Sequence, residues 1–359
     1  MIVNSIPHIL ADDQIPFLEG IPPRLARITR LPGCLIDKEA VKAVDVLLVR
    51  TRARCDASLL ENSHVSFIGS ATIGTDHIDI PYCESCGIRV VNAPGCNAGA
   101  VMQYVFTALE AWAAKKNRDL CGKTLGVVGV GNVGKKVVEL ANHLGMQTLL
   151  NDPPRALAEG SAGFVQLAEL LTHADIVTLH VPLAPDTRGM ADRAFFSSMK
   201  KGACLVNTSR GEVVDEEALK DAAKDMGGII LDVWQNEPLI DMETLQITDI
   251  ATPHIAGYSL EGKKNASQTV IRALADHFGW KELETHTISL PPPRPVPNDL
   301  LFTHCFPIFV EDKQLRSAPH QFEAFRKAYV YRREWTPEQY RQLTLCLPKK
   351  IWHSLNATD

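Results

Sequence analysis

The chain has 359 residues, of which 45% are hydrophobic and 22% charged, with a formal net charge of −5 at pH 7. At about 150 residues per domain, this length predicts two domains and leaves room for a small third one. The composition excludes disordered, collagen-like and coiled-coil proteins, and no apolar run approaches the ~20 residues that cross a bilayer. A pI of about 6.2 provides no general positive field for nucleic acid or anionic lipid. We therefore expect a cytoplasmic protein that binds neither nucleic acid nor membrane.

Short apolar runs in the first part of the chain predict the strands of an α/β unit. These runs are His8–Ala11, Asp45–Thr51 and Val65–Gly69. Each is bounded by turn or helix residues, as is typical of buried parallel strands. A long helical pattern follows from Asn97 to Ala114, and the polar stretch Lys115–Gly122 separates it from the next part of the chain.

From Lys123 onward the sequence alternates strand and helix patterns. The predicted strands are Thr124–Val128, Met146–Asn151, Ile176–His180, Cys204–Asn207, Ile229–Asp232 and Asp249–Thr252. The segment Val133–Leu144 has one apolar face and is followed by Gly145, as expected of an amphipathic helix and its stop. This alternation predicts a doubly wound parallel sheet.

A glycine loop joins the first of these strands to its helix. Gly129, Gly131 and Gly134 form the pattern G-x-G-x-x-G, and Asp152 follows the next predicted strand. In this context the glycines allow the backbone and a helix N-terminus to approach a pyrophosphate. Asp152 can accept hydrogen bonds from a ribose diol and would repel a 2′-phosphate, which favours NAD over NADP, although Arg155 lies nearby. A tight turn without any ligand is the structural alternative.

Three charged or titratable residues follow the ends of later strands. Arg210, Glu237 and His254 each lie at or just after such an end, where ligands bind in doubly wound sheets. Imidazole suits a general base that removes a hydroxyl proton, a carboxylate can orient it, and arginine can hold a substrate carboxylate bidentately. Taken singly, the same residues could be a core histidine, a helix-terminal acid and a surface ion pair.

The cysteines do not predict a metal site. Cys83 and Cys86 form the one C-x-x-C among nine cysteines, and no second pair of ligands follows at zinc-site spacing. We expect no metal, reduced thiols, and a short helix ending at Gly87 in which both cysteines act as small apolar residues.

The sequence changes character after Leu290. Prolines crowd residues 291–297 and predict a stiff linker. The rest of the chain is richer in aromatic and basic residues, with helical patterns near Gln321–Tyr331 and Pro337–Leu345. We interpret this part as an appendage that serves assembly.

Four motifs in the catalytic half resemble the D-isomer-specific 2-hydroxyacid dehydrogenases. They are Gly129–Gly134, Asn207–Gly211, Leu231–Pro238 and Thr252–Ala256. The resemblance implies two Rossmann-like doubly wound domains, and it assigns the family's catalytic arginine, glutamate and histidine to Arg210, Glu237 and His254. It also places Asp232 where the family contacts the nicotinamide carboxamide.

Further motifs narrow the resemblance to a branch that oxidises 4-phospho-D-erythronate with NAD on the bacterial route to pyridoxal 5′-phosphate. The motifs are Gly69–Asp79, Ala93–Ala98, Asp152–Arg155, His254–Lys263 and Arg332–Trp335. This likeness implies substrate contacts at Thr51, Thr72 and Tyr258. It implies further cofactor contacts at Asn132, Val133, Val181, Thr208, Ser209 and Gly257. Thr51 and Val181 stand where the branch has serine and threonine, so only the backbone of Val181 could form a hydrogen bond.

The resemblance also implies a domain plan. Residues 1–95 and 256–290 would form the substrate domain, residues 96–255 the NAD-binding Rossmann domain, and residues 291–359 a small α+β dimerisation domain. Arg50, Arg52 and Arg54 alternate along the end of the second predicted strand and would share one face if the strand persists, so we expect Arg50 or Arg54 to bind the substrate phosphate, with a solvated basic strand end as the alternative. The alternatives are a sibling enzyme acting on another 2-hydroxy acid, such as 3-phosphoglycerate, and a non-catalytic NAD-sensing protein.

Overall fold

The computed structural model describes residues 6–292 and 306–341. The chain divides into two compact units. Unit 1 comprises Met1–Asn97 and Ser259–Pro292, and unit 2 comprises Ala98–Tyr258 and Pro293–Asp359. Each unit has a parallel sheet and helices of its own.

Unit 1 is built on a five-stranded parallel sheet with the order β2-β1-β3-β4-β5. Its strands are β1 (His8–Asp12), β2 (Arg27–Leu31), β3 (Val46–Val49), β4 (Phe67–Ser70) and β5 (Arg89–Val91). Its helices are α1 (Lys38–Val41), α2 (Ala57–Leu60), α3 (Ile80–Ser85), α11 (Leu260–Phe278) and α12 (Lys281–Glu284).

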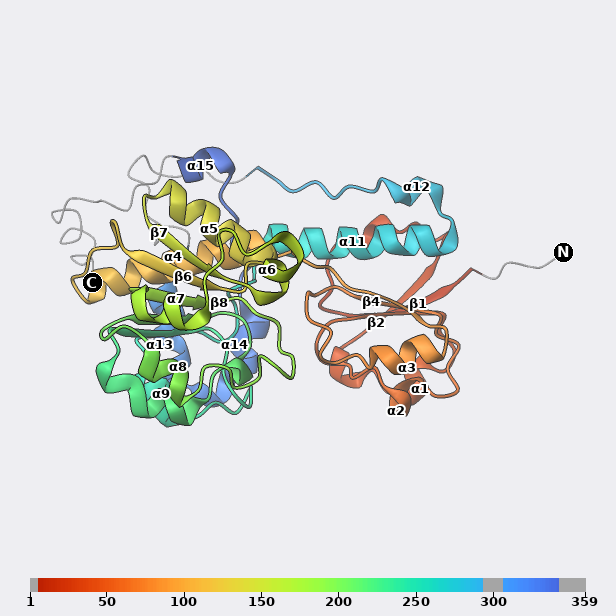
Figure 1. The fold of residues 1–359 in the computed structure, drawn as a ribbon. Helices are drawn as coiled ribbons and strands as arrows, with labels where there is room; N and C mark the ends of the chain where they lie inside the picture. The colour runs from red at the N-terminus through yellow and green to blue at the C-terminus, as the bar shows by residue number, and fades with distance from the viewer. Residues whose placement is uncertain (1–5, 293–305, 342–359) are drawn as a thin grey trace. The chain divides into compact units, whose positions relative to one another are not determined.

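Side-chain alternation along the strands gives this sheet two apolar faces. Ile9 and Val46 pack into a core with Val270 of α11. The neighbouring residues Leu10 and Leu47 belong to the core on the opposite face, together with residues of α1, α2 and α3. Figure 1 shows α11 on one side of the sheet and the three short helices on the other. Both faces are covered, as parallel sheets require.

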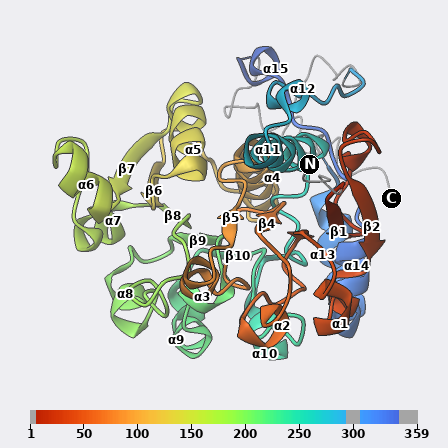
Figure 2. The ribbon, with the colours of Figure 1, turned by 90° about the vertical axis from the view of Figure 1, so that its right-hand side faces the viewer.

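Unit 2 contains a six-stranded parallel sheet with the order β11-β10-β9-β8-β6-β7. Its strands are β6 (Thr124–Val128), β7 (Gln147–Asn151), β8 (Ile176–Leu179), β9 (Cys204–Asn207), β10 (Gly228–Leu231) and β11 (Ile250–Ala251). The helices between Ala98 and Tyr258 are α4 (Ala98–Lys115), α5 (Asn132–His143), α6 (Pro153–Glu159), α7 (Leu167–His173), α8 (Arg193–Ser198), α9 (Glu216–Ala222) and α10 (Met242–Ile247). Figure 2 shows the strands following one another from β7 through β6 and β8 to β10.

The second sheet is likewise covered on both faces. Val127 and Val206 pack with α4 and α5 in one core, whereas Val128 and Leu205 pack with α7, α8 and α9 in the other. Helix α4 is buried along most of its length, which explains why its sequence carries so few charges. Each fully buried aliphatic side chain stabilises such a core by roughly 1.5–3 kcal/mol.

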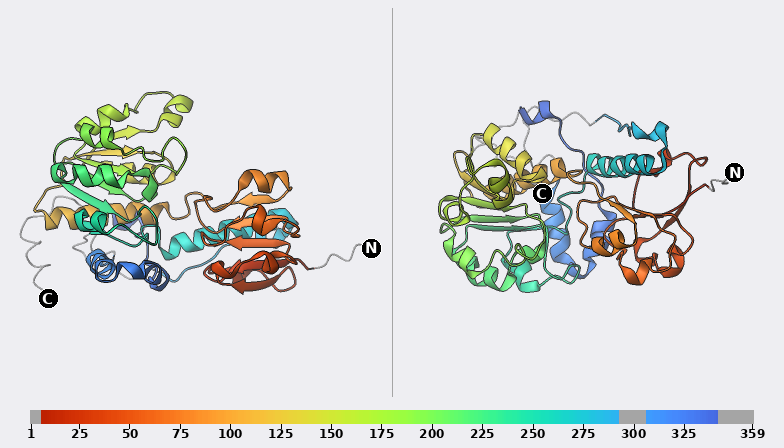
Figure 3. Two further views of the ribbon diagram at one scale, coloured as in Figure 1. Left: turned by 90° about the horizontal axis from the view of Figure 1, so that it is seen from below. Right: turned by 45° about the vertical axis from the view of Figure 1, so that its right-hand side comes forward.

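The described part of the C-terminal segment is helical and packs on unit 2 (Figure 3). It contains α13 (Ile308–Ser317), α14 (Phe322–Ala328) and α15 (Pro337–Arg341). Helix α13 contacts β11 and α4, and Leu315 and Phe322 are both fully buried. Most of the predicted proline linker and the end of the second predicted helix, residues 342–345, lie outside the described residues.

The predicted strands of both units are confirmed, with β6 and β9 matching residue for residue. Strands β2 and β5 were missed. The predicted end of the second strand at Thr51 was wrong, because β3 ends at Val49 and residues 51–53 form a bend. Arg50, Arg52 and Arg54 therefore do not alternate along a strand.

The cysteine predictions had mixed outcomes. Helix α3 ends before Gly87 as predicted, and Cys83 is buried, but Cys86 is exposed and does not act as a core residue. Six described cysteines are free: Cys34, Cys55, Cys83, Cys86, Cys96 and Cys204. Cys121 is disulfide-bonded, so the prediction of reduced thiols was wrong at this position. It lies in the exposed turn before β6, where spacing along the chain does not reveal which thiols meet.

Within the described ranges, none of the helices has the length and apolar character needed to span a membrane. The same residues contain no group of three or more histidine, cysteine or acidic side chains arranged to hold a metal ion.

Candidate active site

The predicted cofactor and catalytic residues of unit 2 follow the carboxyl ends of its strands. Gly129 follows β6, Asp152 follows β7, and Val181 comes two residues after β8, while Arg210 and Asp232 come after β9 and β10. The strand order reverses between β6 and β8. At such a reversal the connections leave the sheet on opposite faces and open a crevice for a ligand.

The three glycines of the loop differ in what surrounds them. Gly129 has a positive φ of 87°, and a Cβ there would lie 2.8 Å from the carbonyl carbon of His180. A Cβ on Gly134 would collide with the carbonyl oxygen of Gly129. Gly131, by contrast, is exposed, and a Cβ on it would have nothing within 4 Å. Two glycines therefore shape the turn, and the third leaves open space in front of the helix.

Helix α5 begins at this open space. Its N-cap is Gly131, which supplies no side-chain acceptor for the first N–H groups. Asn132 is exposed and Val133 is half-buried. Free N–H groups at a helix N-terminus attract anionic groups such as a pyrophosphate.

Asp152 links the glycine loop to helix α6. One carboxylate oxygen accepts a hydrogen bond from the N–H of Val130 at 2.8 Å, and the other accepts one from the N–H of Arg155 at 3.1 Å. The guanidinium of Arg155 is paired with Glu159 and also donates to the carbonyl of Val130. Arg155 was the one residue near Asp152 that spoke against a preference for NAD over NADP. Its guanidinium is hydrogen-bonded to other groups of the protein.

The residues that follow β8 and β9 contact one another at the carboxyl edge of the sheet. His180 contacts Thr178 through Nε2 at 3.0 Å and Thr208 through Nδ1 at 3.5 Å. Burial lowers the pKa of His180 to about 3, so its ring is neutral at ordinary pH. Val181 is half-buried. The hydroxyl of Ser209 donates to Asn207 Oδ1 at 2.8 Å, so it serves the turn itself.

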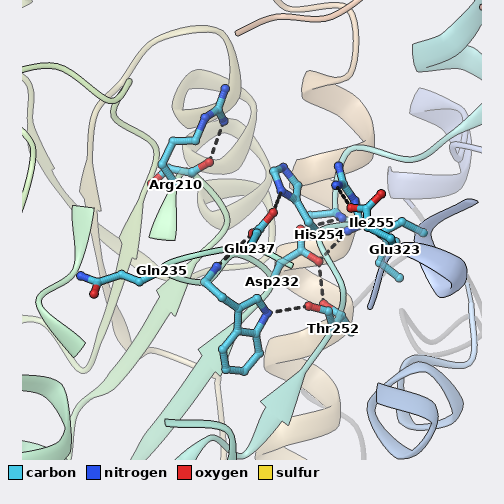
Figure 4. Close-up of polar contacts among 12 residues, drawn as sticks. Arg210, Asp232, Gln235, Glu237, Thr252, His254, Ile255 and Glu323 are labelled. Atoms are coloured by element: carbon cyan, nitrogen blue, oxygen red, sulfur yellow. Dashed lines mark hydrogen bonds and ion pairs between the residues drawn. The ribbon is translucent and has the colours of Figure 1, made fainter. Parts of the chain in front are cut away.

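Arg210 is held next to the β10 loop by its neighbours. Asn207 Nδ2 donates to the carbonyl of Arg210 at 2.9 Å, and a Cβ on Gly211 would collide with the backbone of Trp234. Only glycine permits this close approach of the two segments. The guanidinium of Arg210 donates to the carbonyl of Ser209 at 2.8 Å. Figure 4 draws this hydrogen bond and, separately, the hydrogen-bonded group around His254.

Glu237 and His254 form a hydrogen-bonded pair (Figure 4). His254 Nδ1 donates to Glu237 Oε2 at 2.7 Å, and the N–H of Trp234 donates to Glu237 Oε1 at 3.0 Å. Burial alone would raise the pKa of the Glu237 carboxyl, but the charge and hydrogen bond of His254, with smaller contributions from Arg326 and Trp234, hold that pKa below its ordinary value. This arrangement fixes the imidazole and leaves its Nε2 available for proton transfer.

The backbone around His254 is strained and firmly held. His254 has a φ of 57°, in the left-handed region that side chains other than glycine rarely adopt. Its N–H donates to the carbonyl of Asp232 at 2.7 Å. Strain of this kind persists where the surroundings fix it, and it is frequent at functional sites.

Asp232 holds the backbone of the segment that follows His254 through hydrogen bonds. Its side chain is almost completely buried and accepts hydrogen bonds from the Thr252 hydroxyl at 2.6 Å and from the N–H groups of Ile255 and Ala256, both at 2.8 Å. Burial raises the pKa of Asp232, although His254 and these donors oppose the shift. Asp232 was predicted as a cofactor contact, and here its carboxylate organises the catalytic segment.

Gly257 and Tyr258 end this segment, and both are half-buried. The hydroxyl of Tyr258 accepts a hydrogen bond from Arg326 Nη2 at 3.4 Å. Arg326 also lies over the Tyr258 ring and donates to Glu323 at 2.7 Å. Glu323 is labelled in Figure 4 together with His254 and Ile255.

The residues predicted in unit 1 lie at the carboxyl edge of its own sheet. Arg50 and Thr51 follow β3, and Thr72 follows β4. Asp12, at the end of β1, is buried; burial raises its pKa, and the charges of Arg50 and Lys263 counteract this. Thr51 is exposed, and Thr72 shares a 2.8 Å hydrogen bond with Ser70. Arg54 is exposed and pairs with Asp56 at 2.8 Å.

Comparisons with known proteins show the family to which the chain belongs. The sequence profile of the D-isomer specific 2-hydroxyacid dehydrogenase, NAD binding domain, matches residues 102–256. The chain is 42% identical to the erythronate-4-phosphate dehydrogenase of Bacteroides fragilis, over 91% of this chain and 97% of that protein. It is 38% identical to the enzyme of the same name from Escherichia coli, over 91% of this chain and 92% of that protein. The chain belongs to the erythronate-4-phosphate dehydrogenase family.

Solved structures show the same fold. TT0316 protein from Thermus thermophilus has a TM-score of 0.66 at 28% identity, covering 76% of this chain and 97% of its own. NAD⁺-bound 3-phosphoglycerate dehydrogenase from Entamoeba histolytica has a TM-score of 0.66 at 26% identity, covering 80% of this chain and 100% of its own. Like its family, the chain is an NAD-dependent oxidoreductase with two parallel-sheet α/β domains. In both comparisons, a fifth or more of the residues of this chain have no counterpart in the solved structure.

Several residues of this edge were missed by the sequence reasoning. Asn207 organises the turn before Arg210. Glu216 accepts the N–H of Gln235 at 2.9 Å and so fixes the loop that carries Glu237. Arg326 and Arg332 reach the site from the C-terminal segment. Asn207 stands inside a quoted motif and could have been found there, but the contacts of Arg326 and Arg332 span long sequence separations and leave no local pattern.

Proposed function

We propose that this chain oxidises 4-phospho-D-erythronate to (R)-3-hydroxy-2-oxo-4-phosphooxybutanoate, a step in the synthesis of pyridoxal 5′-phosphate. The observation that carries the proposal is the pairing of His254 Nδ1 with Glu237 Oε2 at 2.7 Å. It lies at the ligand-binding edge of a chain whose relatives, 42% and 38% identical, bear the name of that dehydrogenase.

NAD, when bound, accepts the hydride that leaves C2 of the substrate. In the proposed mechanism, His254 Nε2 removes the proton of the C2 hydroxyl while Glu237 holds Nδ1 and stabilises the imidazolium that forms. Arg210 holds the substrate carboxylate and polarises the developing carbonyl. General base catalysis of this kind contributes about 10²–10⁴-fold to the rate.

The glycine loop fits the cofactor. The open space in front of Gly131 and the N-terminus of α5 would receive the pyrophosphate. Asp152 would accept hydrogen bonds from the ribose diol in addition to the two that it accepts from Val130 and Arg155. We propose further contacts from Asn132, Val133, Val181, Thr208, Ser209, Asp232 and Gly257.

For the substrate, we propose contacts from Thr51, Thr72 and Tyr258, with Arg50 or Arg54 binding the phosphate. The side chain of Arg54 is 85% exposed and paired with Asp56, which favours Arg50 as the stronger anion ligand because a half-buried charge is screened less. Arg50→Ala should raise KM for the phosphorylated acid more than Arg54→Ala does. If neither substitution changed that KM, neither arginine would bind the phosphate.

We also propose that residues 1–95 and 256–290 bind substrate, residues 96–255 bind NAD, and residues 291–359 make a homodimer. Exposed apolar side chains in the C-terminal segment support the last assignment: Phe309 is 44%, Val310 58% and Val330 86% exposed. Analytical ultracentrifugation should give a dimer, and Val310→Asp should shift it toward monomer. We also propose that the enzyme works in the cytoplasm.

The decisive experiment compares NADH formation from 4-phosphoerythronate, 3-phosphoglycerate and unphosphorylated erythronate. A preference for 4-phosphoerythronate that is lost with its phosphate supports the proposal. Equal or faster use of another acid would leave the catalytic pair in place but refute the proposed substrate. A single-turnover measurement with an added 2-keto acid as oxidant controls for trapped NADH, which would imitate an inactive protein.

A further inference from the structure

The segment Ile255–Tyr258 follows the proposed catalytic histidine, and its backbone groups are held by two buried, oppositely charged side chains. Asp232 accepts the N–H groups of Ile255 and Ala256, each at 2.8 Å. The carbonyl groups of the segment point to Arg332, which stands in the C-terminal segment and has only 6% of its surface exposed. Asp232 thus serves the N–H donors of this short loop and Arg332 serves its carbonyl acceptors.

The contacts of Arg332 are numerous and directed. Nη1 donates to the carbonyl of Ile255 at 3.0 Å and to that of Tyr258 at 3.1 Å. Nη2 donates to the carbonyl of Ala256 and, at 3.0 Å, to that of Ala100 in helix α4. The guanidinium also lies 4.6 Å from the centre of the Phe306 ring. A planar guanidinium reaches these carbonyls from donors spread over separate nitrogens, whereas the three donors of a lysine ammonium all radiate from one nitrogen.

Anchoring of the C-terminal segment does not by itself explain this arrangement. Arg316 already performs that task on another part of unit 2. It pairs with Asp312 and donates to the carbonyls of Leu245 at 2.8 Å and Thr248 at 2.6 Å. Arg332 instead contacts the loop on which the strained His254 depends.

We propose that Arg332 is a positioning residue for catalysis, which holds the carbonyls of Ile255–Tyr258 and thereby fixes His254 and Tyr258 in their working geometry. The C-terminal segment is then part of the catalytic apparatus as well as a surface for assembly. The inference rests on the proposed function insofar as His254 is the base.

The test compares Arg332→Lys and Arg332→Met with the matched control Arg316→Met, another arginine of the same segment that donates to backbone carbonyls. Misplacing a catalytic group by about 1 Å costs on the order of 10²-fold in rate. We expect Arg332→Met to lower kcat by about that factor and Arg332→Lys by a smaller one. The dissociation constant of NADH should rise by a much smaller factor than kcat falls, because the glycine loop does not contact Arg332, and of the cofactor contacts proposed above only Gly257 belongs to the segment that Arg332 holds. Arg316→Met should lower the melting temperature and leave kcat within about twofold.

A second measurement does not depend on turnover. Hydrogen exchange followed by mass spectrometry reports on the amides of Ile255, Ala256 and Tyr258, the last of which donates to Ile255 O at 2.8 Å. Exchange in the peptide that spans them should accelerate in both Arg332 variants and not in Arg316→Met. The lysine variant keeps the charge, and it decides the question if the methionine variant does not fold.

Two outcomes would overturn the proposal. One is an Arg332 variant that folds and retains wild-type kcat; the other is unchanged exchange in the Ile255–Tyr258 peptide. Each acid of the substrate panel can serve for the rate comparison. If the wild-type enzyme prefers a different acid, the proposed function is refuted, and the role of Arg332 is tested with that acid instead. If the wild-type enzyme oxidises none of the acids, the hydrogen-exchange experiment decides whether Arg332 holds the Ile255–Tyr258 segment.

Discussion

Glu237 accepts two hydrogen bonds, one on each carboxylate oxygen. His254 Nδ1 donates to one oxygen at 2.7 Å, and the backbone N–H of Trp234 donates to the other at 3.0 Å. The acid therefore fixes the histidine and is itself fixed by the main chain. Such double engagement distinguishes a positioned catalytic pair from a surface ion pair, whose side chains are free to separate. Both residues are largely buried, with 29% and 19% of the His254 and Glu237 side chains exposed.

Replacing Glu237 with glutamine should slow the reaction. Glutamine has one oxygen for two donors and no negative charge, so the imidazolium formed during proton abstraction loses its stabilisation. We expect kcat to fall by about 10- to 10²-fold, measured as steady-state NADH formation. If Glu237→Gln kept wild-type kcat, Glu237 would serve structure alone.

The lowered pKa of Glu237 also has a consequence for stability. A depressed carboxyl pKa stabilises the folded state above the ordinary pKa near 4.5, and this contribution is lost as the pH falls through the folded pKa. The difference in unfolding free energy between wild type and Glu237→Gln should therefore be largest near neutral pH and shrink in acid. Urea unfolding at pH 7 and in the acid range measures it, and a difference that grows in acid would contradict the assignment.

Replacing His254 with asparagine should remove the base and spare the cofactor site. We expect kcat to fall by 10²-fold or more, while NADH fluorescence titration gives a nearly unchanged dissociation constant. The glycine loop that we assign to NAD follows β6, whereas His254 follows β11 at the far side of the same sheet. Undiminished turnover in this variant would overturn the proposed mechanism.

The glycines of the loop permit a test that separates binding from folding. Gly131 has open space around the position of a Cβ, whereas Gly134 would collide with the Gly129 carbonyl. Gly131→Ala should leave the melting temperature nearly unchanged and raise the dissociation constant of NADH, since the methyl group would occupy the approach of the pyrophosphate. Gly134→Ala should lower the melting temperature. Unimpaired NADH binding by Gly131→Ala would place the pyrophosphate elsewhere.

Much of the fold could be predicted because buried parallel strands appear as continuous apolar runs. Strands β6 and β9 satisfy this rule, and their predicted limits match the structure. Strands β2 and β5 do not. They form the two edges of the unit 1 sheet, and β2 contains two arginines in the stretch Arg-Ile-Thr-Arg-Leu. Half-exposed edge strands lack the apolar run on which the prediction depended.

The candidate site was predictable to the extent that it follows strand ends. Arg210, Glu237 and His254 all follow the carboxyl ends of strands of one sheet, and their motifs predicted them as the catalytic residues. The partners that hold them were not predictable, because Asp232 reaches Ala256 across 24 residues and Arg332 reaches Ala100 across 232. Such contacts depend on tertiary packing, for which a single sequence carries no periodic signal.

The neutrality of His180 leads to the last prediction. Burial lowers its pKa to about 3 in the folded chain, against about 6.5 for an exposed histidine. Between these values the unfolded chain binds a proton that the folded chain does not, so stability is lost as the pH falls from about 6.5 to about 3. The loss is at most about 1.4 kcal/mol per pH unit for one proton. His180→Gln should remove this part of the pH dependence, which urea unfolding at pH 7 and pH 5 can measure. An equal loss of stability in wild type and variant would show that His180 titrates normally, with a ring that is open to water.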